Sequence, residues 1–231
     1  MNTIAAEALD EVATRLEKAK DINKEATAIV RDIMQKHGRV IFNGNGYSEE
    51  WVSEARRRGL PNIKSWIESL ESMNTPEAHA LFEKYHVLSK RELESRFEIY
   101  VETYAKHINI EAKTAIQMAR NLYIPAVIAY GRELAESISI LKAVGSSAEV
   151  PSALLSRITG YLGAAAQKLE KLEAETAAAA KIEQTEKRAE AYRDRVFPAQ
   201  AALREEIDAL ETLLPTSLWP VPSYADILFG L

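Results

Sequence analysis

The stretch SKRELESRFEIYVETYAKHINIEAKTAIQMARNLYIPAVIAYGRELAESISILKAV, residues 89–144, decides the fold. Its apolar positions recur every three or four residues, beginning at Leu93 and Phe97 and continuing to Leu141. This spacing places apolar side chains on one face of an α-helix. A single helix of this length needs a partner along it to be stable.

Pro125 interrupts this pattern. Proline has no backbone N–H and its ring crowds the preceding turn. We therefore expect a kink near Tyr123 rather than a straight helix.

The partner is predicted directly downstream, after the break at Gly145-Ser146-Ser147. A second long helix is expected over residues 151–197, and a further one over 199–213. Because the break is short, the two long helices should form an antiparallel hairpin. The seam that would face the helix beginning at Ser89 has heptad-like spacing, whereas Glu173 would point outward. The seam residues are Ala165, Leu169, Leu172, Thr176 and Ala179.

The fold class expected is therefore all-α, a long antiparallel helical hairpin or bundle with shorter N-terminal helices and a docked C-terminal tail. The chain upstream of the hairpin reads as short helical runs, over residues 2–20 and 23–37 and after Ser48.

The most unusual local sequence is IFNGNGYSEEW, residues 41–51. Its Gly44, Asn45 and Gly46 fit neither the P-loop nor the dinucleotide fingerprint, because the lysine and the third glycine that those motifs require are missing. We interpret it as a structural turn in which the glycines allow positive φ and Ser48 caps the next helix. An anion at this helix N-terminus is the alternative, but two glutamates in the first turn would repel it.

Composition argues against several functions. The net charge is −5, and the only basic cluster, Arg56-Arg57-Arg58, is expected to be a solvated helix face, so no nucleic-acid partner is expected. No apolar run is long enough to span a membrane. The chain has no cysteine, which excludes disulfides and thiol chemistry and favours the cytoplasm.

No catalytic or metal-binding set stands out. Glu83 and His86 have the spacing of a di-iron ligand pair, but the second pair that such a site requires is missing. His107 and Glu111 lie one turn apart and are expected to be a surface pair. We therefore expect no catalytic, cofactor-binding or metal-binding residue in this sequence.

The C-terminal tail is a candidate docking surface, because it gathers large apolar side chains in few positions. Exposing them all would create an apolar patch that soluble monomers avoid. We expect the tail to dock within the chain, on the aromatic residues Trp51, Trp66 and Phe82, or otherwise on a partner. The candidate docking residues are Trp219, Tyr224, Ile227, Leu228 and Phe229.

Several segments resemble the C-terminal part of type III glutamine synthetase. They are AEALDEVATRLEKA (6–19), KHGRVIFNGNGYSEEWVSEARRRGLPNIK (36–64), LFEKYHVLSKRELESRFEIYVETYAKHINIEAKTAIQMAR (81–120) and LWPVPSYADILFGL (218–231). The resemblance implies that residues 1–40 are helices from the end of the catalytic domain. Residues 41–88 would be a connecting turn with short helices, and residues 89–231 the helical hairpin or bundle with its tail.

In that family the catalytic residues lie upstream, so the resemblance carries none of them onto this chain. It implies that the isolated segment is inactive, whereas the whole enzyme uses ATP and a divalent metal to join ammonia to glutamate. It also implies two partners, the N-terminal catalytic domain and further copies of the chain in a homo-oligomer. The alternative is a stand-alone helical interaction module without enzymatic activity.

Overall fold

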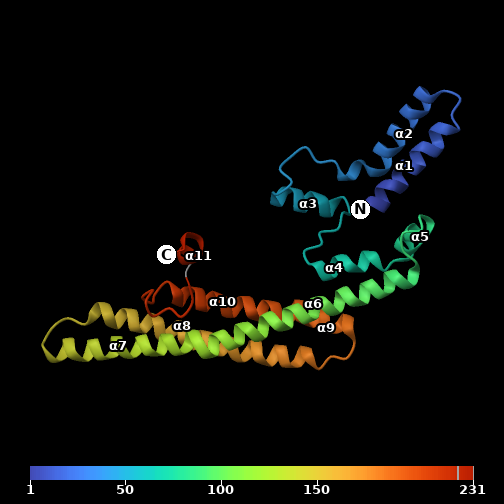
Figure 1. Cartoon of the computed structure of the whole chain (residues 1–231). Coiled ribbons are helices and arrows are strands. Elements are labelled where there is room, and N and C mark those ends of the chain that lie inside the picture. Colours follow the sequence, from blue (N-terminus) through green and yellow to red (C-terminus); the bar gives the residue numbers. More distant parts are fainter. Residues whose placement is uncertain (223, 231) are drawn as a thin grey trace. The chain divides into compact units, whose positions relative to one another are not determined.

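The structure is a computed structural model that describes residues 1–222 and 224–230. Within these residues every regular element is helical and no strand occurs, which confirms the expected all-α class (Figure 1). The chain divides into two compact units, Met1–Tyr100 and Val101–Leu231.

The first unit consists of short helices and the start of a long one. They are α1 (Asn2–Glu17), α2 (Ile22–His37), the 3₁₀ turn η1 (Gly38–Val40), α3 (Glu49–Arg57), α4 (Trp66–Leu70), the 3₁₀ turn η2 (Glu71–Met73), α5 (Pro76–Lys84) and the beginning of α6 (Lys90–Met118). Side-chain oxygens cap the N-termini of five of these helices, at Asp21, Ser48, Ser65, Thr75 and Ser89.

Ion pairs hold α1 and α2 together more than a core does. α1 buries none of its residues, and α2 buries only Ile29. Arg15 of α1 reaches across to two carboxylates of α2, Glu25 and Asp32, each at 2.7 Å. The apolar core of this unit lies instead at α4 and the start of α6, where Leu70 and Leu93 are buried.

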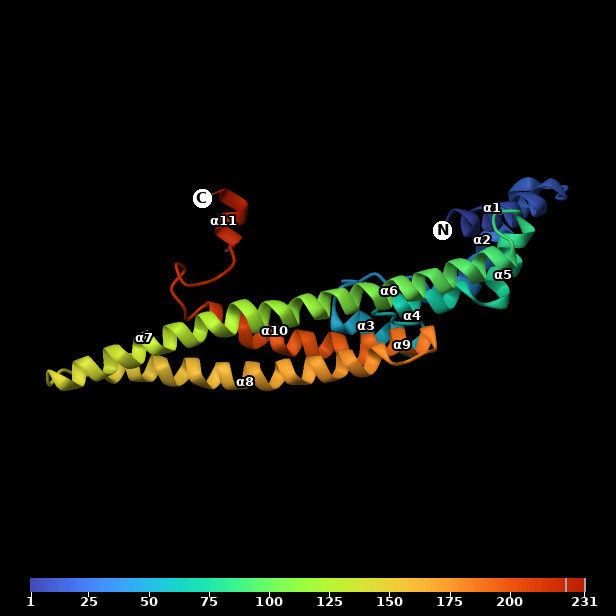
Figure 2. The ribbon, with the colours of Figure 1, turned by 60° about the horizontal axis from the view of Figure 1, so that its bottom comes forward.

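The second unit begins within α6 and contains the long helices. α6 continues through the π-helical turn η3 (Ala119–Tyr123) into α7 (Ile124–Ala143), and α8 (Glu149–Ala180) follows. The chain then forms α9 (Thr185–Ala191), the π-helical turn η4 (Tyr192–Val196), α10 (Phe197–Glu211) and α11 (Tyr224–Phe229). Figures 1 and 2 show α7 and α8 side by side, with α10 lying along α8.

The hairpin between α7 and α8 forms as the sequence predicts. Gly145 has a φ of +73°, which glycine adopts without strain. The N–H of Ser146 donates to the carbonyl oxygen of Leu141 at 2.9 Å, closing the end of α7.

At Tyr123, where a kink is expected, the helix contains a wider, π-helical turn. The N–H of Ile124 donates to the carbonyl oxygen of Ala119, five residues back, so α6 runs into α7 through η3. A π-turn of this kind is wider than an α-helical turn, so it leaves space for the ring of Pro125 and tolerates the missing backbone N–H of that residue. The same solution recurs at η4, which ends two residues before Pro198.

The second long helix is shorter than expected, because it ends at Ala180 instead of continuing to residue 197. Residues 181–184 turn the chain back, and Arg188 Nη1 donates to the carbonyl oxygens of Ile182 and Glu183 at 3.2 and 3.4 Å. A side chain from the next helix thus binds carbonyl groups of the turn itself.

The predicted seam on α8 is buried, and α7, which continues the helix that begins at Ser89, packs along α8 as expected. α10, α9 and η4 also pack against α8. Glu173 does not point outward into solvent: one of its oxygens lies 2.5 Å from Arg120. The buried seam residues are Ala165, Leu169, Leu172, Thr176 and Ala179.

Candidate functional site

The turn before α3 is closed by side chains of its own residues. Asn45 Oδ1 accepts the N–H of Tyr47 at 3.0 Å, and the Ser48 hydroxyl donates to the carbonyl oxygen of Asn45 at 2.8 Å. Ser48 Oγ also accepts the N–H of Trp51 at 3.3 Å and so caps α3. The polar side chains of this segment therefore form hydrogen bonds that fix its backbone conformation.

Gly44 and Gly46 are not explained by positive φ, which was the reason expected for glycine in this turn. Neither Gly44 nor Gly46 has a positive φ. A Cβ on Gly44 would lie 2.6 Å from the ring of Phe42, whereas a Cβ on Gly46 would meet nothing within 4 Å. Gly44 therefore leaves room for the Phe42 ring in its present position, and the structure gives Gly46 no comparable reason.

An aromatic pair anchors the turn to α3. The rings of Phe42 and Trp51 are stacked with centroids 4.5 Å apart and an interplanar angle of 27°. The guanidinium carbon of Arg58 lies 5.6 Å from the centroid of the Trp51 ring, within the range of a cation–π contact.

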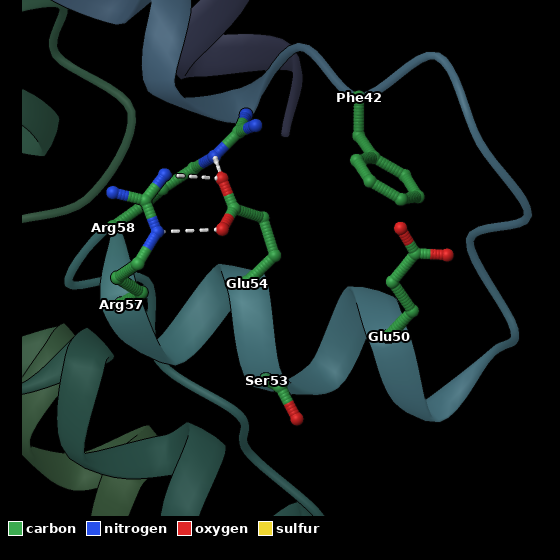
Figure 3. A pocket seen from close by; sticks show the side chains of 6 residues that line it. All are labelled: Phe42, Glu50, Ser53, Glu54, Arg57 and Arg58. Carbon is green, nitrogen blue, oxygen red and sulfur yellow. Dashed lines mark hydrogen bonds and ion pairs between the residues drawn. The ribbon is translucent and has the colours of Figure 1, made fainter.

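The carboxylate of Glu54 lies between two guanidinium groups, as Figure 3 shows. Arg57 binds both of its oxygens at 2.6 Å, and Arg58 Nε donates to Oε1 at 2.5 Å. Arg58 Nη1 continues to the carbonyl oxygens of Arg39 and Ile41 at 3.2 and 2.6 Å. Arg58 is thus a brace between α3 and the preceding loop, whereas Arg56 and Arg57 are exposed, as a solvated helix face requires.

These contacts determine what the cluster can do chemically. The hydrogen bonds from Arg57 and then from Arg58 lower the pKa of Glu54 from 4.5 to about 2. At neutral pH Glu54 is therefore ionised with both oxygens engaged, so it is a poor general acid or base. The hollow that Glu54 lines with Phe42, Glu50 and Ser53 (Figure 3) is best explained as part of this structural brace.

The tail docks within the second unit, but on a different aromatic residue from those expected. Trp219 stacks on Tyr123 of η3, with centroids 5.0 Å apart and an interplanar angle of 15°. Three apolar side chains near the end of the tail remain largely exposed: Ile227, Leu228 and Phe229 are 66, 72 and 73% exposed. The side chain of Tyr224 lies outside the described residues.

The other sequence candidates do not form a site. Glu83 Oε1 accepts the backbone N–H of Lys90 at 3.3 Å, and His86 is a turn residue with a φ of +54°. His107 and Glu111 are both exposed on α6. Among the residues that the structure describes, no three His, Cys, Asp or Glu side chains are grouped to hold a metal ion. None of the described helices is both long and apolar enough to cross a membrane.

Comparison with known proteins identifies relatives over nearly the whole chain. Residues 25–142 match the family described as glutamine synthetase C-terminal domain. The chain is 33% identical to a type-3 glutamine synthetase of Dictyostelium discoideum over 99% of its own length and 32% of the relative's. It is 30% identical to a glutamine synthetase of Butyrivibrio fibrisolvens, over 91% of the chain and 30% of the relative. A glutamine synthetase of Bacteroides fragilis is also 30% identical, over 82% and 27%.

Proposed function

Because the chain belongs to the glutamine synthetase C-terminal domain family, we propose that it is the helical C-terminal part of a type III glutamine synthetase. It spans about a third of the length of the curated relatives that it matches. The catalytic part would then come from polypeptide outside this sequence. That part would use ATP and a divalent metal to join ammonia to glutamate, and the present chain would contribute no catalytic residue.

The observation that supports a docking role is the uncovered apolar surface of α1 and α2. On α1, Leu9 is 69% exposed, and on α2, Val30 is 60% exposed with Met34 one turn further on at 53%. Soluble proteins rarely leave such side chains clustered in water unless a partner covers them. We therefore propose that the catalytic part of the enzyme packs on these exposed side chains of α1 and α2.

A role in assembly follows from the same proposal. The chain would join a homo-oligomer in which helical surfaces set the contacts between subunits or between domains. The absence of cysteine fits the reducing cytoplasm, where we propose that the enzyme works.

The docking face can be tested with a double substitution, Val30→Ser with Met34→Ser. In the isolated chain both side chains are exposed, so the unfolding temperature should hardly change. In a complete enzyme that carries this sequence, the same substitutions should lower the unfolding temperature and the γ-glutamyl transferase activity, because the interface is lost. Lys36→Ser, a change of an exposed polar residue on α2, is the matched control.

Two results would contradict the proposal. The first is an unchanged complete enzyme after the double substitution, which would show that this face is not an interface. The second is glutamine synthesis by the isolated chain, surviving repurification. A native start codon at residue 1 with its own promoter would instead support the stand-alone interaction module.

A further inference from the structure

A hollow of about 360 Å³ lies in the second unit between η3, α10 and the tail. Tyr123 comes from η3, Leu203 and Ile207 come from α10, and Trp219 comes from the tail. Its volume is within the range of small-molecule sites, which start near 300 Å³. It is independent of the face on α1 and α2 and of any catalytic role.

Two polar atoms at this hollow are buried and have no hydrogen-bond partner. One is the indole nitrogen Nε1 of Trp219, which can only donate, and the other is Oε1 of Gln200, which can only accept. Both residues line the hollow. A buried polar atom without a partner destabilises the fold, so such atoms are normally satisfied by protein, water or ligand.

The walls of the hollow suit a flat, apolar body. Trp219 and Tyr123 are stacked on one another, which holds two aromatic rings in a fixed orientation. Tyr123 belongs to a π-helical turn, an element found frequently at functional sites. Leu203 and Ile207 contribute buried aliphatic side chains from α10.

The charges at the hollow argue against an anionic ligand. Arg204 Nε lies 3.2 Å from Asp208 Oδ2, so these two opposite charges neutralise one another. Glu211 also lines the hollow and adds a negative charge. An anionic ligand would meet repulsion from this carboxylate without a free cation to balance it.

From these features we propose that the hollow binds a neutral, planar small molecule with an adjacent hydrogen-bond donor and acceptor, as in a carboxamide or a lactam ring. The acceptor of the ligand would receive the N–H of Trp219, and its donor would bind Oε1 of Gln200. The ring would lie against the aromatic and aliphatic walls. This proposal goes beyond the function proposed above and does not depend on it.

The experiment uses the full 231-residue chain and three probes, nicotinamide, uracil and benzene. Isothermal titration calorimetry at millimolar probe measures the affinity, and ligand-observed NMR confirms contact with the protein. Nicotinamide or uracil should bind, and benzene, which lacks a donor and an acceptor, should bind at least tenfold more weakly.

Two variants remove one polar atom each. Trp219→Phe keeps an aromatic ring on Tyr123 but removes the donor, and Gln200→Leu removes the acceptor. Each should weaken nicotinamide or uracil binding about tenfold. Gln167→Leu, at an exposed site on α8, should leave the affinity unchanged. Circular dichroism verifies folding, and Gln200→Met replaces Gln200→Leu if the latter fails to fold.

Three outcomes would overturn the proposal. In the first, neither nicotinamide nor uracil binds, which would mean that water alone satisfies the two buried atoms. In the second, benzene binds as tightly as the polar probes, so that the hollow is merely apolar. In the third, binding survives both substitutions, which would place the probe elsewhere on the chain.

Discussion

Arg58 Nη1 donates a hydrogen bond of 2.6 Å to the carbonyl oxygen of Ile41, 17 residues earlier in the chain. The same side chain binds Glu54 on its own helix and lies over the ring of Trp51. It therefore joins the end of α3 to the loop that precedes the helix, which explains how a glycine-rich turn keeps one conformation.

Arg58→Ala should loosen this loop. It removes two hydrogen bonds to backbone carbonyls, so the free energy of unfolding of the first unit should fall by about 1–3 kcal/mol. Amide hydrogen exchange should accelerate over residues 41–51. Arg56→Ala, at an exposed position on the same helix, is the control and should change stability by less than about 0.5 kcal/mol. Equal exchange in both variants would mean that the arginine brace is not formed in solution.

The pH dependence of stability should report the same brace. The pKa of Glu54 is lowered to about 2 in the folded chain, against 4.5 without the arginines. Its contribution to stability is therefore present above pH 4.5 and is lost as the pH falls toward 2. Glu54→Gln should flatten the fall of the urea midpoint within this window. Glu50→Gln, which alters an exposed carboxyl of the same helix, should retain the wild-type slope; identical slopes for all three proteins would refute the interpretation.

Substituting each glycine of the turn in its own variant should distinguish the roles of Gly44 and Gly46. Gly44→Ala would place a Cβ 2.6 Å from the Phe42 ring, so the ring must move away from Trp51. We expect a loss of about 1–3 kcal/mol and a weaker near-UV circular dichroism signal from Trp51. Gly46→Ala, where a Cβ meets open space, should be nearly neutral. A reversed order of the two effects would show that the turn is built differently.

These positions show how far the sequence alone could predict the structure. The helix period, the Gly145 turn and the cap at Ser48 are local signals, and the structure agrees with each. For Arg58 the sequence predicts a solvated face. Its partners are the backbone carbonyl groups of Arg39 and Ile41, which are distant in sequence, and the side-chain pattern does not indicate contacts with backbone atoms. The close approach of Phe42 to Gly44 is local, but it depends on where the Phe42 ring lies, which the residue pattern does not indicate.

The end of α8 could not be predicted from the sequence. Residues 176–184 contain neither glycine nor proline, and alanine has the highest helix propensity. The local sequence therefore predicts that the helix continues through them. The chain turns because α9 and α10 then pack back along α8, with Arg188 binding the carbonyl groups of the turn. Tertiary packing decides such a boundary.

The seam of α8 can be tested by truncating one fully buried side chain. Leu172 is completely shielded from solvent, so Leu172→Ala should cost about 2–5 kcal/mol by leaving a cavity between α8 and its neighbours. Lys171→Ala, the adjacent exposed position, should leave the thermal midpoint almost unchanged. Comparable losses at both positions would mean that the seam lies on another face of the helix.

The two halves of the tail should behave differently, because only the first half is docked. Trp219 stacks on Tyr123, so Trp219→Ala removes a large aromatic contact and should lower stability by about 2–4 kcal/mol. Ile227, Leu228 and Phe229 are more than half exposed, so replacing all three with serine should leave the melting temperature of the isolated chain unchanged. The triple variant should instead weaken self-association in sedimentation velocity runs, since it removes an apolar surface that a partner would cover. A destabilised triple variant would mean that α11 packs on its own chain in solution, whereas unchanged melting of Trp219→Ala would show that the tail is not anchored at Tyr123.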